Sequence, residues 1–564
     1  MQLYINTAKL IALVMSMGML TPVSAQKISK FWVTFTDKNE SPFCLCRPQE
    51  FLSDRSLERR KRGGILLTET DLPVNPAYVN GVKNVGAEIH SSSKWLNAVA
   101  VMADSTTARK LEKLPFVQSV QYLGPHLKYR NPPNRKEKKR APLSTYPAIQ
   151  GRDIPFWGYA TQQNQLLGIP LLHMAGHRGN GIWVAVMDGG FTHVDTIPMF
   201  DSIALQGKLF QGRDFVERDQ AVYESAQHGT SVLSVMAANM PYYFVGTAPE
   251  ATYFLLKTED TGGEFPIEEA NWVAGAEWAD SVGIDIINAS LGYTAFNDRS
   301  LGHFKSELDG KSSIGARGAQ LAARKGMIVC NSAGNEGDGE WRTIGVPADA
   351  FDIIAVGAVD ASGSRAAFSS MGPTSDLRIK PDLVAPGDQV VVAGNVGISL
   401  GISSGTSLAS PMLTGAIASL WSAFPEKSAA EIVDAVYASA DQRFAPDNER
   451  GYGLPEMTEA WFRLANLENG NGGVFQYEPQ SGELNYYWVA KGFEAGKTVE
   501  LRDVLGRKVG EYPIENKNYP VAQLHISGLQ NIPPGHYQVI LTSETGVRRL
   551  GAATWNGRHE VRMH

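Results

Sequence analysis

Between about residues 155 and 465 the chain alternates short apolar runs with helical patterns, and this alternation constrains the fold most. The runs lack polar alternation, so each is expected to be a strand buried on both faces of a sheet. The expected strands are Ile182–Met187, Thr252–Leu256, Ile284–Asn288, Met327–Cys330 and Ile353–Val356. The expected helices are His228–Ala238, Glu268–Val282, Gly315–Arg324 and Ser407–Phe424. This order predicts an α/β fold, with a mainly parallel sheet covered by helices on both faces.

The flanks of this central domain, taken as residues 155–468, have a different character. Residues 26–125 alternate strand and helix patterns, which predicts a small α+β module. Its expected elements are strands Lys30–Thr36, Trp95–Val101 and Val117–Tyr122 and helices Glu50–Arg62 and Ser105–Leu114. Residues 474–564 carry alternating strand patterns and turn residues, which predict a small all-β module. A chain of 564 residues is too long for one core, so separate units are expected.

Two segments without periodicity connect these units. Residues 126–154 contain several prolines and the basic run Arg135–Arg140, which is typical of an exposed, cleavable linker. A nucleic-acid-binding patch is the alternative, but the formal net charge of −6 gives no reason to expect nucleic acid as a partner. Residues 469–473 read Asn-Gly-Asn-Gly-Gly and predict a flexible hinge.

The first 25 residues have the features of a secretory signal peptide. Lys9 precedes the apolar stretch Leu10–Leu20, and Val23–Ala25 offers small residues for cleavage. The apolar stretch is shorter than the roughly 20 residues that span a bilayer. A buried N-terminal helix is the alternative interpretation. No later stretch suggests a transmembrane segment, so we expect an exported protein.

Three cysteines are present, and no disulfide framework is expected from them. Cys44 and Cys46 are separated by one residue, which is an awkward spacing for a bond between them. Cys330 is expected as a small buried hydrophobe.

Four polar residues of the central domain follow expected strands or begin expected helices. Asp188 ends an apolar run before two glycines, and Asn335 follows Gly334 after another run. His228 begins one helix, and Ser407 begins the most apolar helix, where the positive end of the helix dipole favours a developing anion. Taken singly, each has an ordinary structural explanation, such as a turn or a helix cap.

Together, in the order Asp, His, Asn, Ser, these residues resemble the subtilisin family of serine peptidases. Further matching segments are Asp285–Gly292, Ala355–Val359, Phe368–Ser370, Lys380–Gly387 and Gly451–Gly453. The resemblance implies that Ser407 attacks the peptide carbonyl, His228 accepts and returns its proton, and Asp188 orients the imidazole. It implies that Asn335 and the Ser407 backbone N–H form an oxyanion hole. It also implies a substrate pocket walled by Ser290, Leu291, Gly292, Ala333 and Gly334.

The flanking modules have resemblances of their own. Residues 27 to about 125 resemble the inhibitory propeptide of the same family, and an N-terminal domain that stays attached is the alternative. The tail resembles the type IX secretion sorting domains of Bacteroidetes proteins in Val499–Val509, Leu524–Leu529 and Pro534–Tyr537. A carbohydrate- or protein-binding β-module is the alternative there, because the chain continues through Trp555 to His564 beyond the usual final strand.

The expected function is therefore that of a secreted or cell-surface serine endopeptidase, made as an autoinhibited precursor in a Gram-negative bacterium and exported through the periplasm. Its expected partners are polypeptide substrates, its own propeptide and the secretion machinery. The chemistry requires no cofactor. Many members of the family bind Ca²⁺, but ligands scattered over loops are not readable from one sequence.

A catalytically silent relative used for binding or adhesion is the alternative function. The nucleophile segment Gly405–Ala409 lacks the second glycine of a lipase elbow, and the chain has no His-Glu-x-x-His motif of a metalloprotease.

Overall fold

The computed structural model describes residues 27–126 and 155–465, together with strand segments of the tail between residues 474 and 563. The predicted signal peptide, nearly all of the linker at 126–154 and the hinge at 469–473 lie outside the described residues. Within the described part of the chain, none of the helices combines the length and the apolar character that a membrane crossing requires.

The central domain is built on a seven-stranded sheet in the order β13-β12-β11-β10-β5-β9-β6, and each pair of neighbours in it is parallel. The strands are β5 (Trp183–Asp188), β6 (Leu209–Asp214), β9 (Thr252–Lys257), β10 (Ile286–Ala289), β11 (Ile328–Ser332), β12 (Ile354–Val359) and β13 (Leu383–Pro386). The predicted α/β class and the five predicted strands are confirmed. Strands β6 and β13 were not predicted; β6 is an edge strand with exposed positions, so it lacks a continuous apolar run.

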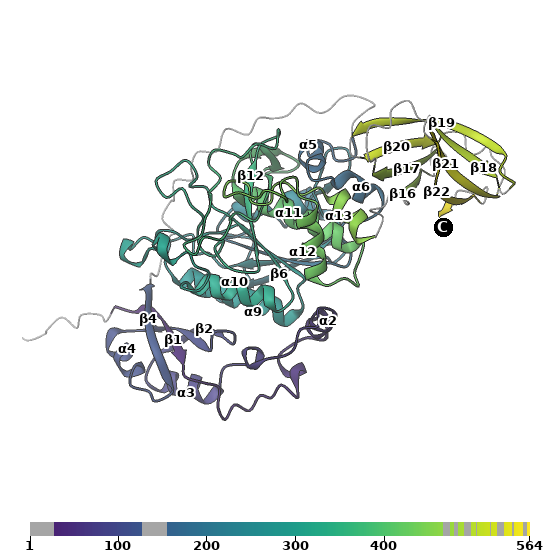
Figure 1. Ribbon diagram of the computed structural model, residues 1–564. Coiled ribbons are helices and arrows are strands. Elements are labelled where there is room, and N and C mark those ends of the chain that lie inside the picture. Colours follow the sequence, from purple (N-terminus) through teal and green to yellow (C-terminus); the bar gives the residue numbers. More distant parts are fainter. Residues whose placement is uncertain are drawn as a thin grey trace, which may run out of the picture.

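Helices cover both faces of this sheet (Figure 1). Helices α8 (His228–Ala237) and α11 (Thr406–Ser422) pack on one face, and α9 (Ile267–Val282) and α10 (Ile314–Arg324) pack on the other. Alternate residues of β5 point to the two faces: Val184 and Val186 enter the first core, and Ala185 and Met187 enter the second. Shorter elements complete the domain: α5 (Thr161–Gln165), α6 (Ile169–Met174), α7 (Asp201–Leu205), α12 (Ala429–Ala438), α13 (Met457–Leu464), β7 (Asn239–Met240), β8 (Phe244–Val245), β14 (Val390–Ala393) and β15 (Leu400–Ser403).

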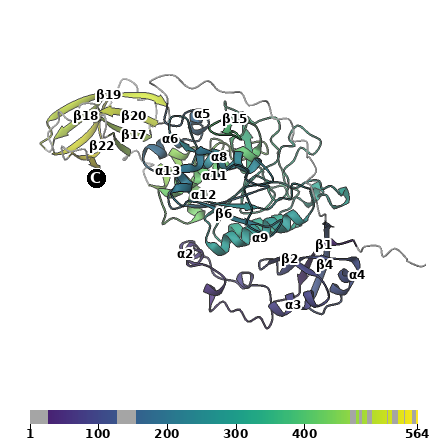
Figure 2. The ribbon, with the colours of Figure 1, turned by 180° about the vertical axis from the view of Figure 1, so that it is seen from behind.

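The N-terminal module is an antiparallel sheet in the order β2-β3-β1-β4 that lies against α9 (Figures 1 and 2). Its elements are β1 (Ser29–Phe35), α2 (Asp54–Arg62), α3 (Pro76–Asn84), β2 (Glu88–Ser93), β3 (Ala98–Ala103), α4 (Ser105–Leu111) and β4 (Val117–Pro125). One face of the sheet, with Trp32 and Ala98, shares a core with α9, whereas Val33 and Val99 pack on the other face in the module's own core. The predicted α+β module is confirmed, with α3 and β2 in addition.

Helix α2 differs from the expected arrangement. It was predicted as part of the module's own fold, but it lies away from the four-stranded sheet, at the C-terminal end of α9 (Figures 1 and 2).

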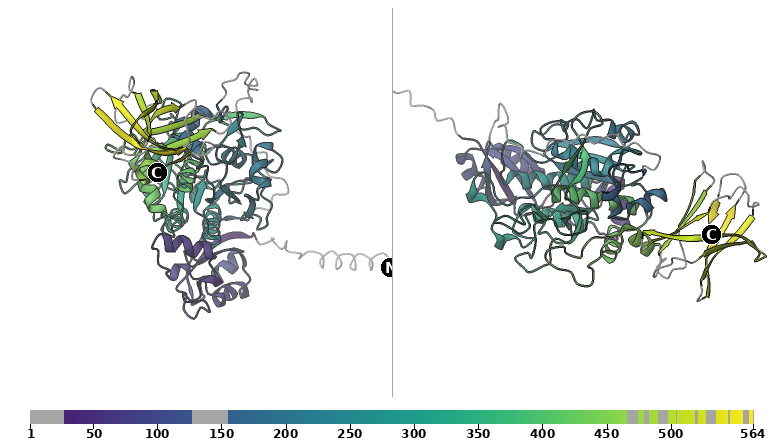
Figure 3. Two further views of the ribbon diagram at one scale, coloured as in Figure 1. Left: turned by 90° about the vertical axis from the view of Figure 1, so that its right-hand side faces the viewer. Right: turned by 90° about the horizontal axis from the view of Figure 1, so that it is seen from above.

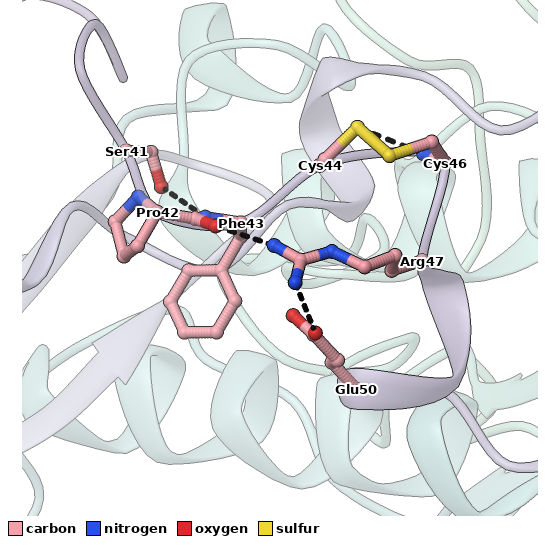
Figure 4. The surroundings of a disulfide bond; sticks show 7 residues. All are labelled: Ser41, Pro42, Phe43, Cys44, Cys46, Arg47 and Glu50. Atoms are coloured by element: carbon pink, nitrogen blue, oxygen red, sulfur yellow. Dashed lines mark hydrogen bonds and ion pairs between the residues drawn. A yellow bond between two sulfur atoms is a disulfide. The ribbon is translucent and has the colours of Figure 1, made fainter.

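The segment before α2 contains a disulfide between Cys44 and Cys46, with Cα atoms 5.1 Å apart (Figure 4). The expectation against this bond was wrong, because a turn in which the Arg47 N–H donates to the Cys44 carbonyl brings the two side chains together.

The tail forms an antiparallel sheet in the order β16-β17-β20-β19-β18-β21-β22-β23, in agreement with the predicted all-β module (Figure 3). Its strands are β16 (Val474–Glu478), β17 (Glu483–Val489), β18 (Thr498–Asp503), β19 (Lys508–Asn518), β20 (Val521–Ile526), β21 (Gly535–Ser543), β22 (Gly546–Trp555) and β23 (Val561–Met563).

Candidate active site

Asp188 is the last residue of β5, at the carboxyl edge of the parallel sheet, where ligand sites of such sheets lie. Its carboxylate is 1% exposed, accepts a hydrogen bond from the Gly189 N–H at 2.8 Å, and lies 2.8 Å from Nδ1 of His228. The chain turns sharply just after it. Gly190 has φ +146°, and a Cβ there would lie 1.9 Å from the Glu224 carbonyl oxygen, so this turn accommodates only glycine.

His228 is the first residue of α8, so its imidazole stands at a helix end. Its side chain is 39% exposed, in contrast to the buried Asp188. The contact between Nδ1 and a buried carboxylate fixes the ring and leaves Nε2 as the nitrogen that can exchange a proton with another group. The pair therefore has the geometry of an oriented general base.

Ser407 lies in the first turn of α11, after the N-cap residue Gly405. Backbone N–H groups in a first helical turn have no partner within the helix, and the positive end of the helix dipole is concentrated there. Pro411, four residues later, has no N–H to offer to the Ser407 carbonyl. The hydroxyl of Ser290 donates to that carbonyl instead, at 2.8 Å.

A buried hydrogen-bond network extends from this contact. Nδ2 of Asn288 donates to the Ser290 hydroxyl at 3.1 Å, and Oδ1 of Asn288 accepts from Ser410 and Thr414 of α11. Strand β10 and the helix that carries Ser407 are thus joined through Asn288 and Ser290. Ser290 was expected in the pocket wall, and this second role was not predicted, although a proline inside the helix pattern could have indicated it.

Asn335 follows β11 and faces the start of α11. Its Oδ1 accepts hydrogen bonds from the N–H and the hydroxyl of Thr406, at 2.8 and 3.0 Å, which leaves Nδ2 as the donor. The preceding Gly334 has φ +113°, and a Cβ there would lie 2.9 Å from the Ser370 hydroxyl. The backbone next to Asn335 therefore depends on glycine.

These four residues line one cavity of about 360 Å³. Its wall also includes Ser290, Leu291, Gly292 and Gly334, four of the five residues expected there. Ala333, the fifth, is fully buried in a core cluster with Tyr293 and Val346 and lies behind the wall. Its own backbone N–H donates to the Val356 carbonyl within the sheet.

Three carboxylates that were not predicted from the sequence line the same cavity, those of Glu259, Glu264 and Glu268. One oxygen of each lies within 4.8 Å of the others, and oxygen ligands of this kind suit a hard cation. Burial raises the pKa of Glu259 to about 8, and burial with the nearby Glu259 raises that of Glu268. Glu259 follows β9 at the same sheet edge as Asp188, which is the signal that could have revealed it.

Comparison with known proteins identifies two family models that match parts of the chain. Residues 179–453 match the model of the subtilase family, and residues 30–141 match that of the peptidase S8 propeptide domain of Bacteroidota. Among solved structures, MycP3 protease from the type VII (ESX-3) secretion system is similar at 22% identity and a TM-score of 0.44, covering 57% of this chain and 91% of that one.

Two curated relatives are similar at higher sequence identity. Subtilisin NAT of Bacillus subtilis subsp. natto is 30% identical over 364 residues, which cover 64% of this chain and 79% of the relative. Subtilisin of Bacillus pumilus is 33% identical over 276 residues, which cover 48% of this chain and 88% of the relative. The chain therefore belongs to the subtilase family and is a serine endopeptidase with an N-terminal propeptide domain.

Proposed function

We propose that this endopeptidase cleaves polypeptides with Ser407 as nucleophile, His228 as general base, Asp188 as the group that orients His228, and Asn335 as an oxyanion donor. The observation that carries the proposal is the 2.8 Å contact between Asp188 and His228, on a cavity that Ser407 and Asn335 also line. The proposed chemistry uses these four residues and calls for no cofactor.

In the proposed reaction, the Ser407 hydroxyl oxygen bonds to the peptide carbonyl carbon while its proton passes to Nε2 of His228. Asp188 stabilises the imidazolium that forms, and the Asn335 amide and the Ser407 N–H stabilise the oxyanion. His228 then protonates the leaving amine as the C–N bond breaks, which leaves an acyl-enzyme. Water repeats the sequence and releases the carboxylic acid, with the Ser407 hydroxyl restored.

The substrate is proposed to bind as an extended strand. The segments Ser290–Gly292 and Gly334–Asn335 both line the cavity, and the backbone of the peptide is proposed to lie along them. Backbone pairing of this kind is independent of side chains, so an unfolded protein such as casein is a suitable first substrate.

The proposal is tested by treating the processed enzyme with a fluorophosphonate and measuring casein cleavage and the site of labelling. Complete loss of cleavage, with one adduct on the peptide that contains Ser407, is the expected result. Loss of cleavage with the adduct on another serine would reject Ser407 as nucleophile. Full cleavage after treatment would reject serine catalysis in this cavity.

Replacing Asn335 with alanine should lower kcat for casein about 10²–10³-fold, the loss that removal of one oxyanion donor causes in subtilisin. Because the Nδ2 donor of Asn335 is proposed to act where negative charge develops, KM should change little. The matched control is Asn335→Asp, which keeps the size of the side chain and removes the N–H donor. Steady-state kinetics showing aspartate at wild-type kcat would contradict the proposed role.

The propeptide domain makes the protein a precursor, and we propose that residues 26–125 inhibit the enzyme until the linker at 126–154 is cut. Residues 1–25 are proposed to direct export to the periplasm of a Gram-negative bacterium. The β-rich tail, residues 474–564, is proposed as a type IX sorting domain that brings the enzyme to the cell surface or outside. The match to a propeptide domain of Bacteroidota supports the type IX assignment, because the sorting domains that the tail resembles belong to Bacteroidetes proteins.

The folded precursor should lose stability in acid because of His90. Its Nε2 lies 2.9 Å from Oδ1 of Asn271 on α9, and burial lowers its pKa from 6.5 to about 4, with Lys30, Arg218 and His126 contributing. Because the pKa of His90 is lower in the folded precursor than in the unfolded chain, neutral His90 contributes its full stabilisation above pH 6.5. This contribution is lost as the pH falls towards 4. The loss is at most about 3 kcal/mol, from roughly 1.4 kcal/mol per pKa unit.

The measurement is urea unfolding of the Ser407→Ala precursor at pH 7 and pH 4. The His90→Gln variant should lose less free energy of unfolding between the two than the parent, since glutamine keeps a donor but does not titrate. His193→Gln, at an exposed histidine, is the matched control and should follow the parent. Equal losses in all three proteins would contradict the role of His90.

A further inference from the structure

An arm of the propeptide, residues 37–73, leaves the four-stranded sheet after β1 and returns to it at α3 (Figures 1 and 2). On the way it places α2 against the C-terminal end of α9. The Ser53 N–H donates to the Ser281 carbonyl at 2.9 Å, and the side chain of Arg55 packs at Gly283. The propeptide therefore touches the catalytic domain in two places, through its sheet and through this arm.

Two arginines of α2 are buried in the second contact. The side chains of Arg59 and Arg60 are each 2% exposed, and both bind the fully buried carboxylate of Asp280 on α9, at 2.5 and 2.8 Å. Lys94 of the propeptide adds a third cation, 3.2 Å from Asp280. Burial alone would raise the pKa of Asp280, but Lys94, Arg59 and Arg60 hold it well below its usual range. The carboxylate thus stays charged in mild acid.

The arm also satisfies backbone groups of the catalytic domain. Arg59 donates to the carbonyls of Ile284 and Lys325, which follow the ends of α9 and α10, and Arg55 donates to the carbonyl of Gly283 at 3.0 Å. Carbonyls at helix C-termini lack partners within the helix and carry the negative end of its dipole. A guanidinium group fits such a site because it offers several N–H donors in a plane.

A second acidic residue extends the contact. Asp285, 3% exposed at its side chain, pairs with Arg55 and with Arg62. The same two guanidinium groups lie over aromatic rings of the catalytic domain, Arg55 at 4.3 Å from the centre of Trp183 and Arg62 at 5.1 Å from that of Trp421. Charge, hydrogen bonding and cation–π contact therefore all favour an arginine-bearing helix on this surface.

We propose that this surface, centred on Asp280 and Asp285, is a binding site for an arginine-bearing helix, separate from the catalytic cleft, and that the arm uses it to keep the propeptide bound after the linker is cut. None of the arm's partners lines the cavity that Ser407 lines. The inference rests on the proposed function, because an anchor matters only once the linker is cut.

The test uses the full chain carrying Ser407→Ala, with the linker nicked by brief trypsin treatment at its basic run. Gel filtration after dilution then measures how fast the propeptide leaves. Removing one partner of a buried charge pair acts mainly on the dissociation rate. We expect the propeptide of Arg59→Ala to dissociate about 10²-fold faster than that of its parent. The Arg62 side chain is 22% exposed, so the propeptide of Arg62→Ala should dissociate only about 10-fold faster.

Arg47→Ala is the matched control, because Arg47 lies in the same arm but its exposed side chain bonds within the arm, to Glu50 and to the Pro42 carbonyl (Figure 4). It should dissociate like its parent. If Arg59→Ala fails to fold, Arg62→Ala decides the question by itself. Parental dissociation rates in the folded arginine variants would overturn the anchor. Because trypsin makes the cut and Ser407 is absent, this outcome is independent of whether Ser407 is the nucleophile.

Discussion

Replacing Ser407 with alanine should lower kcat for casein about 2 × 10⁶-fold, the loss that removing the nucleophile causes in subtilisin. Ser407 lies in the first turn of α11, on the cavity that His228 and Asn335 also line. The measurement compares processed wild type with the variant, whose precursor must be nicked externally because it is not expected to process itself. Casein cleavage is followed by release of acid-soluble peptides.

Ser404→Ala is the matched control for this experiment. Ser404 lies three residues earlier and is exposed, and its hydroxyl donates to Asp388 at 2.7 Å. Neither Ser404 nor Asp388 lines the cavity. Its kcat should stay close to that of wild type, because Ser404 does not line the cavity and surface substitutions seldom disturb a fold. If processed wild type were as inert as Ser407→Ala, a binding or adhesion role would replace the proposed catalysis.

Replacing Asp188 with asparagine should lower kcat about 10⁴-fold, as the equivalent change does in serine proteases with this type of triad. Asparagine keeps the size of the side chain but loses the charge that stabilises the His228 imidazolium. It also places an amide where Nδ1 of His228 now meets a carboxylate at 2.8 Å. The effect is smaller than that of Ser407→Ala because the nucleophile remains.

The control for this variant is Asp195→Asn, an exposed carboxylate in the loop that follows the same strand. It should retain wild-type kcat, which would exclude a general effect of lost negative charge. The rate of fluorophosphonate labelling gives a second readout, since nucleophile activation also limits that reaction. Wild-type labelling of Asp188→Asn would show that the contact with His228 does not activate Ser407.

Most of the central fold could be predicted because its strands are buried on both faces. Such strands have to be apolar throughout, so β5, β9, β10, β11 and β12 stand out in the sequence. Asp188 and Asn335 could be placed because the carboxyl edges of parallel strands bring together residues that are far apart along the chain. The order of these residues then led to the family, which the comparisons show.

The remaining features depend on contacts between units, which local patterns do not encode. Strand β2 (Glu88–Ser93) reads as polar, and its two buried residues, His90 and Ser93, bond to Asn271 and Glu277 of α9. Helix α2 reads as a charged surface helix because its partners Asp280 and Asp285 lie more than 200 residues later. Glu259 was overlooked because a carboxylate after a strand has many ordinary explanations.

Pro411 makes the first turn of α11 depend on a residue outside the helix. Because it removes a bond inside α11, the carbonyl of Ser407 is held by Ser290, a residue of the pocket wall. Under the proposed mechanism, a substrate side chain that displaces Ser290 would also displace the turn that carries Ser407. We therefore expect a poorly fitting side chain to lower kcat as well as to weaken binding, so that selectivity would be measured in kcat.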